Sequence, residues 1–169
     1  MKLFSLKILA GFFLTLLFSC AQTKQDHSQH QGHSTSPQQT SESSAVNTDC
    51  QYCGMPSAEF PKWQSKLSTK EGEKYCCSPR CMFLTVLDPK QTVKNIQKIE
   101  VIDFYDTKPI DARKAFYVIK SDVLGPMGSD LVPHRDKTAA EEFMKDHQGS
   151  KILRFEEVDL DMIKQIIQN

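Results

Sequence analysis

The sequence predicts a small α+β domain that follows a secretion signal and a polar tether. The pattern of short strands mixed with three helices gives the fold class. Residues 21–48 contain scarcely an aliphatic side chain, so we expect folding to begin near Asp49. Residues 49–169 then have the length of one domain.

Helix starts and stops are marked by capping residues. Ser78 is placed as an N-cap with Pro79 at the first helical position, and this helix is expected to stop before Asp88 and Pro89. Asp159 caps a final amphipathic helix. The three helices are expected at 78–87, 138–147 and 159–167.

Strands are expected between these helices, separated by turns. A cysteine-bearing turn at 50–55 comes first, a second turn lies at 70–73, and residues 125–128 (Gly-Pro-Met-Gly) form a tight loop. The predicted strands or extended pieces are 62–68, 74–77, 99–105, 115–119, 131–134 and 151–155.

Residues 1–19 have the features of a signal peptide. Lys2 and Lys7 supply positive charge, and the apolar run 8–18 is shorter than the roughly 20 residues that cross a bilayer. The run ends directly before Cys20, which resembles the lipobox of bacterial lipoproteins, where the cysteine becomes the lipid-bearing N-terminus. The alternative is an ordinary secretory signal with Cys20 as a bystander. The absence of Asp after Cys20 resembles lipoproteins sorted to the outer rather than the inner membrane.

Residues 20–48 are expected to be a disordered tether rich in His, Gln and Ser. His27, His30 and His33 recur in it at a spacing of three. They are either polar filler or a weak metal-collecting arm, because imidazole is a borderline ligand for copper or zinc.

The charge balance excludes one class of partner. The whole chain carries 21 basic and 21 acidic residues, and without residues 1–19 the balance is 19 to 21, a formal net charge of −2. A nucleic-acid binder would show a strong basic excess, so nucleic acid is not an expected partner. With no second long apolar stretch, the lipid is the one membrane attachment that we expect.

Two cysteine pairs have the spacing of metal ligands. Cys50 and Cys53 form a CxxC motif on the first turn, and after 23 intervening residues Cys77 and Cys81 open the first helix. A hairpin separates the pairs, and the helix dipole favours a thiolate at Cys81. Cys76 precedes Cys77, and because neighbouring strand residues point to opposite faces, only one of these two is expected to face the site.

Four chemistries compete for these cysteines. Disulfides suit an exported protein but would leave one of the five domain cysteines unpaired. Four cysteines could hold structural zinc. A thiol oxidoreductase is disfavoured, because residues 54–56 (Gly-Met-Pro) break the helix that such a CxxC opens. Cu(I) is favoured by soft thioethers beside the cysteines at Met55 and Met82, and by Met127 in its glycine-flanked loop.

Three motifs in order resemble the NosL family, the lipoprotein accessory proteins of nitrous oxide reductase. Residues 50–55 (CQYCGM) resemble its CxYCGM signature, residues 110–118 (IDARKAFYV) its central strand, and residues 125–133 (GPMGSDLVP) its GPMG…VP stretch. The resemblance implies a non-enzymatic Cu(I) chaperone of the bacterial envelope with Cys and Met ligands. It also implies an α+β fold of two ββα-type halves.

Two departures from the family pattern enlarge the candidate site. Residues 75–83 (YCCSPRCMF) resemble the YHS/TRASH treble-clef metal modules, which implies a treble-clef-like cysteine knuckle and keeps zinc open. His134 follows a Val-Pro pair where the family commonly has an aromatic residue, and it offers an imidazole ligand.

The resulting hypothesis is a lipoprotein metallochaperone that passes Cu(I) by ligand exchange to a client copper protein. The resemblance implies nitrous oxide reductase as that client. The metal ligands expected first are Cys53, Met55 and Met127, followed by Cys50, Cys77, Cys81, Met82 and His134. The alternative is a zinc-stabilised binding module.

Overall fold

The computed structural model describes residues 47–167. The predictions made for the signal peptide, for Cys20 and for the histidines of the tether lie outside these residues. Within the described part, no helix has both the length and the apolar character needed to cross a membrane.

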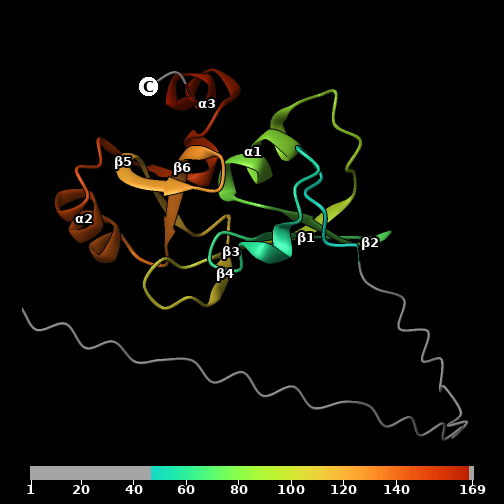
Figure 1. Cartoon of the computed structure of the whole chain (residues 1–169), viewed down its shortest axis with the longest axis horizontal. Coiled ribbons are helices and arrows are strands. Elements are labelled where there is room, and N and C mark those ends of the chain that lie inside the picture. Colours follow the sequence, from blue (N-terminus) through green and yellow to red (C-terminus); the bar gives the residue numbers. More distant parts are fainter. Residues whose placement is uncertain (1–46, 168–169) are drawn as a thin grey trace, which may run out of the picture. The chain divides into compact units, whose positions relative to one another are not determined.

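Two antiparallel sheets and three helices form the described domain, which confirms the α+β class (Figure 1). The first sheet has the order β2-β1-β3-β4, with β1 Ser65–Thr69, β2 Gly72–Cys76, β3 Ile96–Ile102 and β4 Pro109–Asp111. The second has the order β6-β5-β7, with β5 Phe116–Gly125, β6 Gly128–His134 and β7 Lys151–Arg154. The helices are α1 Pro79–Leu87, α2 Lys137–Asp146 and α3 Leu160–Ile167, with 3-10 turns at Ser57–Glu59 and Phe155–Glu157.

The two halves share one topology. A hairpin leads into a helix in each, β1-β2-α1 and β5-β6-α2, and the strand that follows returns to pair with the first strand of that hairpin. The prediction of two ββα-type halves is therefore confirmed. β4 is an addition to the first half, and its three residues are too few to show a periodicity in the sequence.

Side-chain caps lie at the starts of all three helices, two of them at the predicted residues. The Ser78 hydroxyl accepts a hydrogen bond from the Cys81 N–H, and the Asp159 carboxylate accepts one from the Met162 N–H. Asp136 caps α2 in the same way through the Ala139 N–H, so α2 begins at Lys137, one residue before the predicted start.

The largest difference from prediction lies at residues 116–134. The two expected short pieces are a longer hairpin, in which Gly125 pairs with Gly128 across a turn of Pro126 and Met127. Gly128 has φ +91°, a conformation that favours glycine and lets the chain reverse within two residues. Met127 therefore lies at the tip of the hairpin.

The second sheet is covered on both faces, and this positions the site. Val118 and Val132 pack with Phe143 of α2, whereas Tyr117 and Leu131 belong to the core shared with α1. Helix α1 packs against β1, β2 and β6, so it lies between the two sheets (Figure 1). The tip of the β5–β6 hairpin thereby comes beside the first turn of α1.

Candidate metal centre

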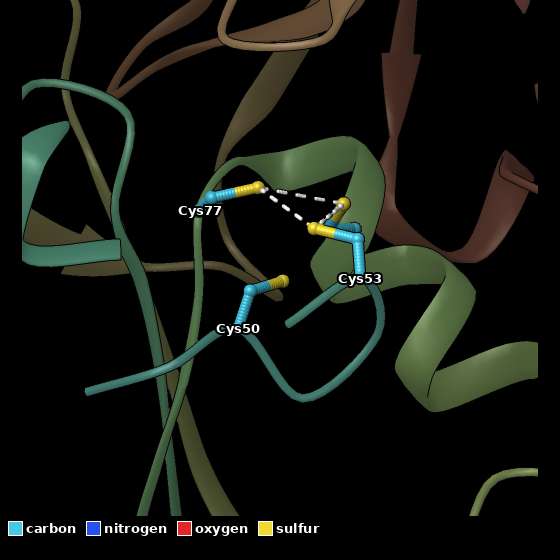
Figure 2. Close-up of side chains that lie close together, drawn as sticks. Cys50, Cys53 and Cys77 are labelled. Carbon is cyan, nitrogen blue, oxygen red and sulfur yellow. Dashed lines mark hydrogen bonds between the residues drawn. The ribbon is translucent and has the colours of Figure 1, made fainter. Parts of the chain in front are cut away.

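Four thiols converge beside the start of α1. The sulfur atoms of Cys50, Cys53, Cys77 and Cys81 all lie within 4.8 Å of one another. Cys53 Sγ is 3.6 Å from Cys77 Sγ and 3.9 Å from Cys81 Sγ, and the Cys77 and Cys81 sulfurs are 3.6 Å apart. Figure 2 shows the labelled side chains of Cys50 and Cys53, which share one loop, and of Cys77, on a second segment, pointing toward one another. We call these four residues the thiol cluster.

The first pair is placed by a tightly folded loop. The Cys50 N–H donates to the Met55 carbonyl at 2.8 Å, and the Gly54 N–H donates to the Cys50 carbonyl at 2.8 Å. Gly54 has φ +75°, so glycine suits the position at which the loop folds back. The Gln51 N–H donates to the Tyr75 carbonyl of β2, which holds the loop against the strand that leads to Cys77.

The second pair is placed by the end of β2 and the first turn of α1. Cys77 follows the last residue of β2, and Cys81 lies one turn into the helix. Cys76 is the fifth cysteine of the described domain. Its sulfur lies 3.5 Å from the Thr85 hydroxyl, and it is not one of the four clustered thiols. The expected alternation thus directs Cys77 into the cluster and Cys76 into the protein interior.

The thiols influence each other's ionisation. Hydrogen bonds from the thiols of Cys76, Cys77 and Cys81 lower the pKa of Cys50. Hydrogen bonding to Cys50 raises the pKa of Cys77 to about 12 and also raises the pKa of Cys81. A thiolate is therefore favoured at Cys50, while Cys77 and Cys81 keep their protons. A metal ion that binds several of these sulfurs must displace those protons, so its affinity will depend on pH.

Met127 is the candidate thioether that the structure brings to the cluster. Its sulfur lies 3.7 Å from Cys81 Sγ, and its side chain is 42% exposed at the hairpin tip. The structure places the other two candidate methionines differently. Met82 is fully buried in the hydrophobic core, and Met55 packs against the same core. Both side chains have a packing role that accounts for their position without a metal.

His134 is not brought to the cluster. Its ring is fully buried among aromatic side chains, with centroid distances of 4.7 Å to Phe143, 5.6 Å to Tyr105 and 6.0 Å to Phe104. Neither ring nitrogen has a hydrogen-bond partner in the described structure. Burial lowers the pKa of His134 to about 4, so its ring is neutral near pH 7.

Arg80 is a buried residue of the site that the sequence analysis missed. It lies between Cys77 and Cys81, is 4% exposed, and donates hydrogen bonds to the carbonyls of Met127 and Ser129 at 2.7 and 2.8 Å. The one signal in the sequence is a charged residue inside a cysteine motif, which is equally typical of a solvated helix start.

A groove opens beside the cluster and gives it access to solvent. Its volume is about 940 Å³, and Tyr52, Cys81, Met127 and Ile167 are among the residues that line it. Tyr52, Met127 and Ile167 are exposed, and Cys53 is exposed as well. The cluster therefore has a buried side and an open side.

The donor set favours soft metal ions. All five described cysteines are free of disulfides, and the donors that converge here are thiol and thioether sulfurs. Sulfur suits Cu(I), and thiolate also suits zinc. A tetrahedral zinc site with bonds of about 2.3 Å has sulfur–sulfur edges of about 3.8 Å, close to the distances within the thiol cluster. The sulfur–sulfur distances thus fit either ion. A thioether donor favours Cu(I) over zinc.

Fold and site together define the class: a small α+β domain of two ββα halves with a sulfur-rich candidate metal centre at their junction. The sequence matches the NosL family over residues 43–163, and the chain belongs to that family. It is 30% identical over 125 residues to the copper-binding lipoprotein NosL of Stutzerimonas stutzeri, a match that covers 69% of this chain and 65% of that relative's length. Its fold is similar to the crystal structure of the copper chaperone NosL from Shewanella denitrificans, with a TM-score of 0.59 and 34% identity, covering 67% of this chain and 90% of that one.

Proposed function

We propose that this protein binds Cu(I) through its thiol cluster and Met127 and passes the ion to a copper protein of the cell envelope. The observation that carries the proposal is the 3.7 Å contact between the Met127 thioether and the Cys81 thiol. A thioether adds affinity for Cu(I) and little for zinc. The names of the two relatives, a copper-binding lipoprotein and a copper chaperone, support copper as the metal.

Transfer is proposed to proceed by ligand exchange. Cys53 and Met127 are exposed, whereas Cys81 lies beneath them with 1% exposure. An acceptor's sulfur or imidazole replaces the exposed ligands first, while the buried thiol still holds the ion.

The role is delivery, without catalysis, and nitrous oxide reductase is the client that we propose. The Cys20 lipid is proposed to hold the protein at the envelope membrane, the outer one in a cell with two membranes.

Metal competition tests the binding proposal. The full-length protein, purified in detergent under anaerobic reducing conditions, is titrated with Cu(I) against a chromophoric Cu(I) chelator and separately with Zn(II) against a zinc dye. We expect one tightly bound Cu(I) that displaces zinc. Zinc that remains bound in the presence of excess Cu(I) would overturn the copper assignment.

Delivery is tested with an acceptor. The Cu(I)-loaded protein is mixed with metal-free nitrous oxide reductase, the two are separated, and copper is measured in each. We expect copper to move to the enzyme faster from this protein than from a small-molecule Cu(I) complex of equal affinity. Equal rates would mean that copper passes through solution, which contradicts direct transfer.

The second candidate function is a binding module stabilised by structural zinc, favoured by the near-tetrahedral sulfur distances. Chelation separates the two functions. A structural zinc domain unfolds when its metal is removed. Here a continuous core that includes Leu67, Val101 and Tyr117 extends well beyond the cysteines, so we expect the circular dichroism spectrum to survive chelation. Its loss would favour zinc.

A further inference from the structure

Arg80 connects the thiol cluster to the hairpin that carries Met127. It lies on α1 between Cys77 and Cys81 and is buried. Its Nη2 donates to the Met127 carbonyl at 2.7 Å and its Nη1 to the Ser129 carbonyl at 2.8 Å. A guanidinium is suited to this task because its planar fork presents two donors at a fixed spacing, which a lysine ammonium does not.

The hairpin returns a contact to the same residue. Asp130 Oδ1 accepts a hydrogen bond from the Arg80 backbone N–H at 2.8 Å and a second from the Leu131 N–H at 2.8 Å. Asp130 is thereby a second cap for the first turn of α1, in addition to Ser78. Asp130 also lies close to Gly125 within the hairpin, where an added Cβ would be 2.7 Å from Asp130 Oδ2.

These reciprocal bonds hold the main chain around Met127 against the start of α1. Met127 is 42% exposed at the hairpin tip, so little packing restrains its flexible side chain. Its main chain, in contrast, is fixed by Arg80. The four thiols are placed by other means: the 50–55 loop, the end of β2 and the Ser78 cap. Loss of the guanidinium should therefore displace the thioether and leave the thiols in place.

We infer that Arg80 is a positioning residue that holds the Met127 thioether against the thiol cluster and so sets the preference of the site for Cu(I) over Zn(II). This inference rests on the proposed copper-binding function. It follows from chemistry, since thioether contributes to Cu(I) affinity and hardly to Zn(II) affinity. Arg80 itself touches no metal. It acts through the backbone carbonyls of Met127 and Ser129.

Affinity measurements on Arg80→Lys test the inference. In the full-length protein in detergent, we expect Cu(I) affinity to fall roughly tenfold, the effect typical of losing a residue that orients a metal ligand. Zn(II) affinity should stay within about twofold of the unchanged protein. Met127→Leu should give the same pattern, and the double variant should lose no more than either single variant.

Spectroscopy gives a readout that general destabilisation would not imitate. In selenomethionine-labelled protein, X-ray absorption at the copper edge should show a Cu–Se distance that disappears in Met127→Leu and in Arg80→Lys. The matched control is Arg154→Lys. The Arg154 guanidinium also donates to a backbone carbonyl, that of Lys114, but it belongs to β7. This variant should keep the Cu–Se signal and both affinities.

Distinct results would overturn the inference. Equal losses of Cu(I) and Zn(II) affinity in Arg80→Lys would indicate a purely structural residue, and so would losses that add in the double variant. A persistent Cu–Se signal would show that the thioether needs no such anchor. If Arg80→Lys does not fold, Arg80→Gln takes its place, and failure of both to fold also counts as a structural role. Failure of the proposed function is seen separately, as weak Cu(I) binding by the unchanged protein.

Discussion

The thioether sulfur of Met127 lies 3.7 Å from the thiol sulfur of Cys81, although 46 positions separate the two residues. Cys81 belongs to the first ββα half and Met127 to the hairpin of the second. The candidate metal centre is therefore shared between the halves, and its composition depends on how they pack.

Replacing Met127 with leucine should make the site less selective. We expect Cu(I) affinity to fall by about tenfold, or about 1.4 kcal/mol, with Zn(II) affinity unchanged, because the lost donor is one that Cu(I) prefers. The ratio of the two dissociation constants, measured by competition titration, is the quantity to compare. Met144→Leu is the matched control, since Met144 packs in the second core away from the cysteines. Identical ratios in the two variants would contradict the ligand role of Met127.

The thiols should differ in importance. Cys53→Ser removes a sulfur that lies within 3.9 Å of both Cys77 and Cys81, so Cu(I) affinity should fall by at least about tenfold. Cys76→Ala removes a buried thiol that contacts Thr85 and Cys50 but is not one of the four clustered thiols. We expect Cu(I) affinity within about threefold of the original and a stability loss of about 1 kcal/mol. Cu(I) titration and urea unfolding measure the two effects. A larger affinity loss for Cys76→Ala would place that sulfur among the ligands.

Acid should weaken the fold through His134. Its pKa is about 4 in the folded protein, because burial opposes the charged form more than nearby Asp103 and Asp136 favour it, and His147 opposes it further. The ordinary value is about 6.5, so between these pH values the unfolded chain binds the extra proton. Neutral His134 therefore makes its full contribution to the free energy of unfolding above pH 6.5. This contribution, at most about 3 kcal/mol, is lost as the pH falls toward 4.

Urea unfolding of His134→Phe across pH 4 to 7 measures this contribution. As the pH falls, the free energy of unfolding of the unchanged protein should decrease relative to that of the variant. The variant must be compared with the unchanged protein because both also contain Asp130, whose pKa is raised to about 6 by burial. The stabilising contribution of protonated Asp130 is lost as the pH rises through 6, the opposite direction to that of His134. A pH-independent difference would show that His134 does not titrate in this way.

The lipid anchor is predicted from sequence alone. Cys20→Ser should abolish incorporation of labelled palmitate, because the substitution removes the thiol that is expected to carry the lipid. Cys76→Ser serves as a control cysteine within the domain and should still incorporate palmitate. Palmitate incorporation by Cys20→Ser at the original level would refute the lipoprotein assignment.

Local patterns in the sequence were sufficient for much of the fold. The N-caps at Ser78 and Asp159 and the glycine turn at Gly54 depend on hydrogen bonds and backbone angles within a few residues, so they are visible in sequence. The same holds for the two cysteine pairs, because a loop and a helix start fix their members locally. The resemblance to the NosL family supplied the two-half arrangement.

Tertiary packing decided the rest. The sequence offers three candidate methionines, Met55 and Met127 ahead of Met82, but only tertiary packing brings Met127 to the thiols and leaves Met82 in the core. His134 was a plausible ligand by its place in the chain, yet the aromatic side chains of other segments enclose it. In the sequence Arg80 resembles a solvated arginine at a helix start, and only the folded hairpin supplies the carbonyls to which it donates. Long-range contacts of this kind depend on how the two halves fit together, which no short stretch of sequence encodes.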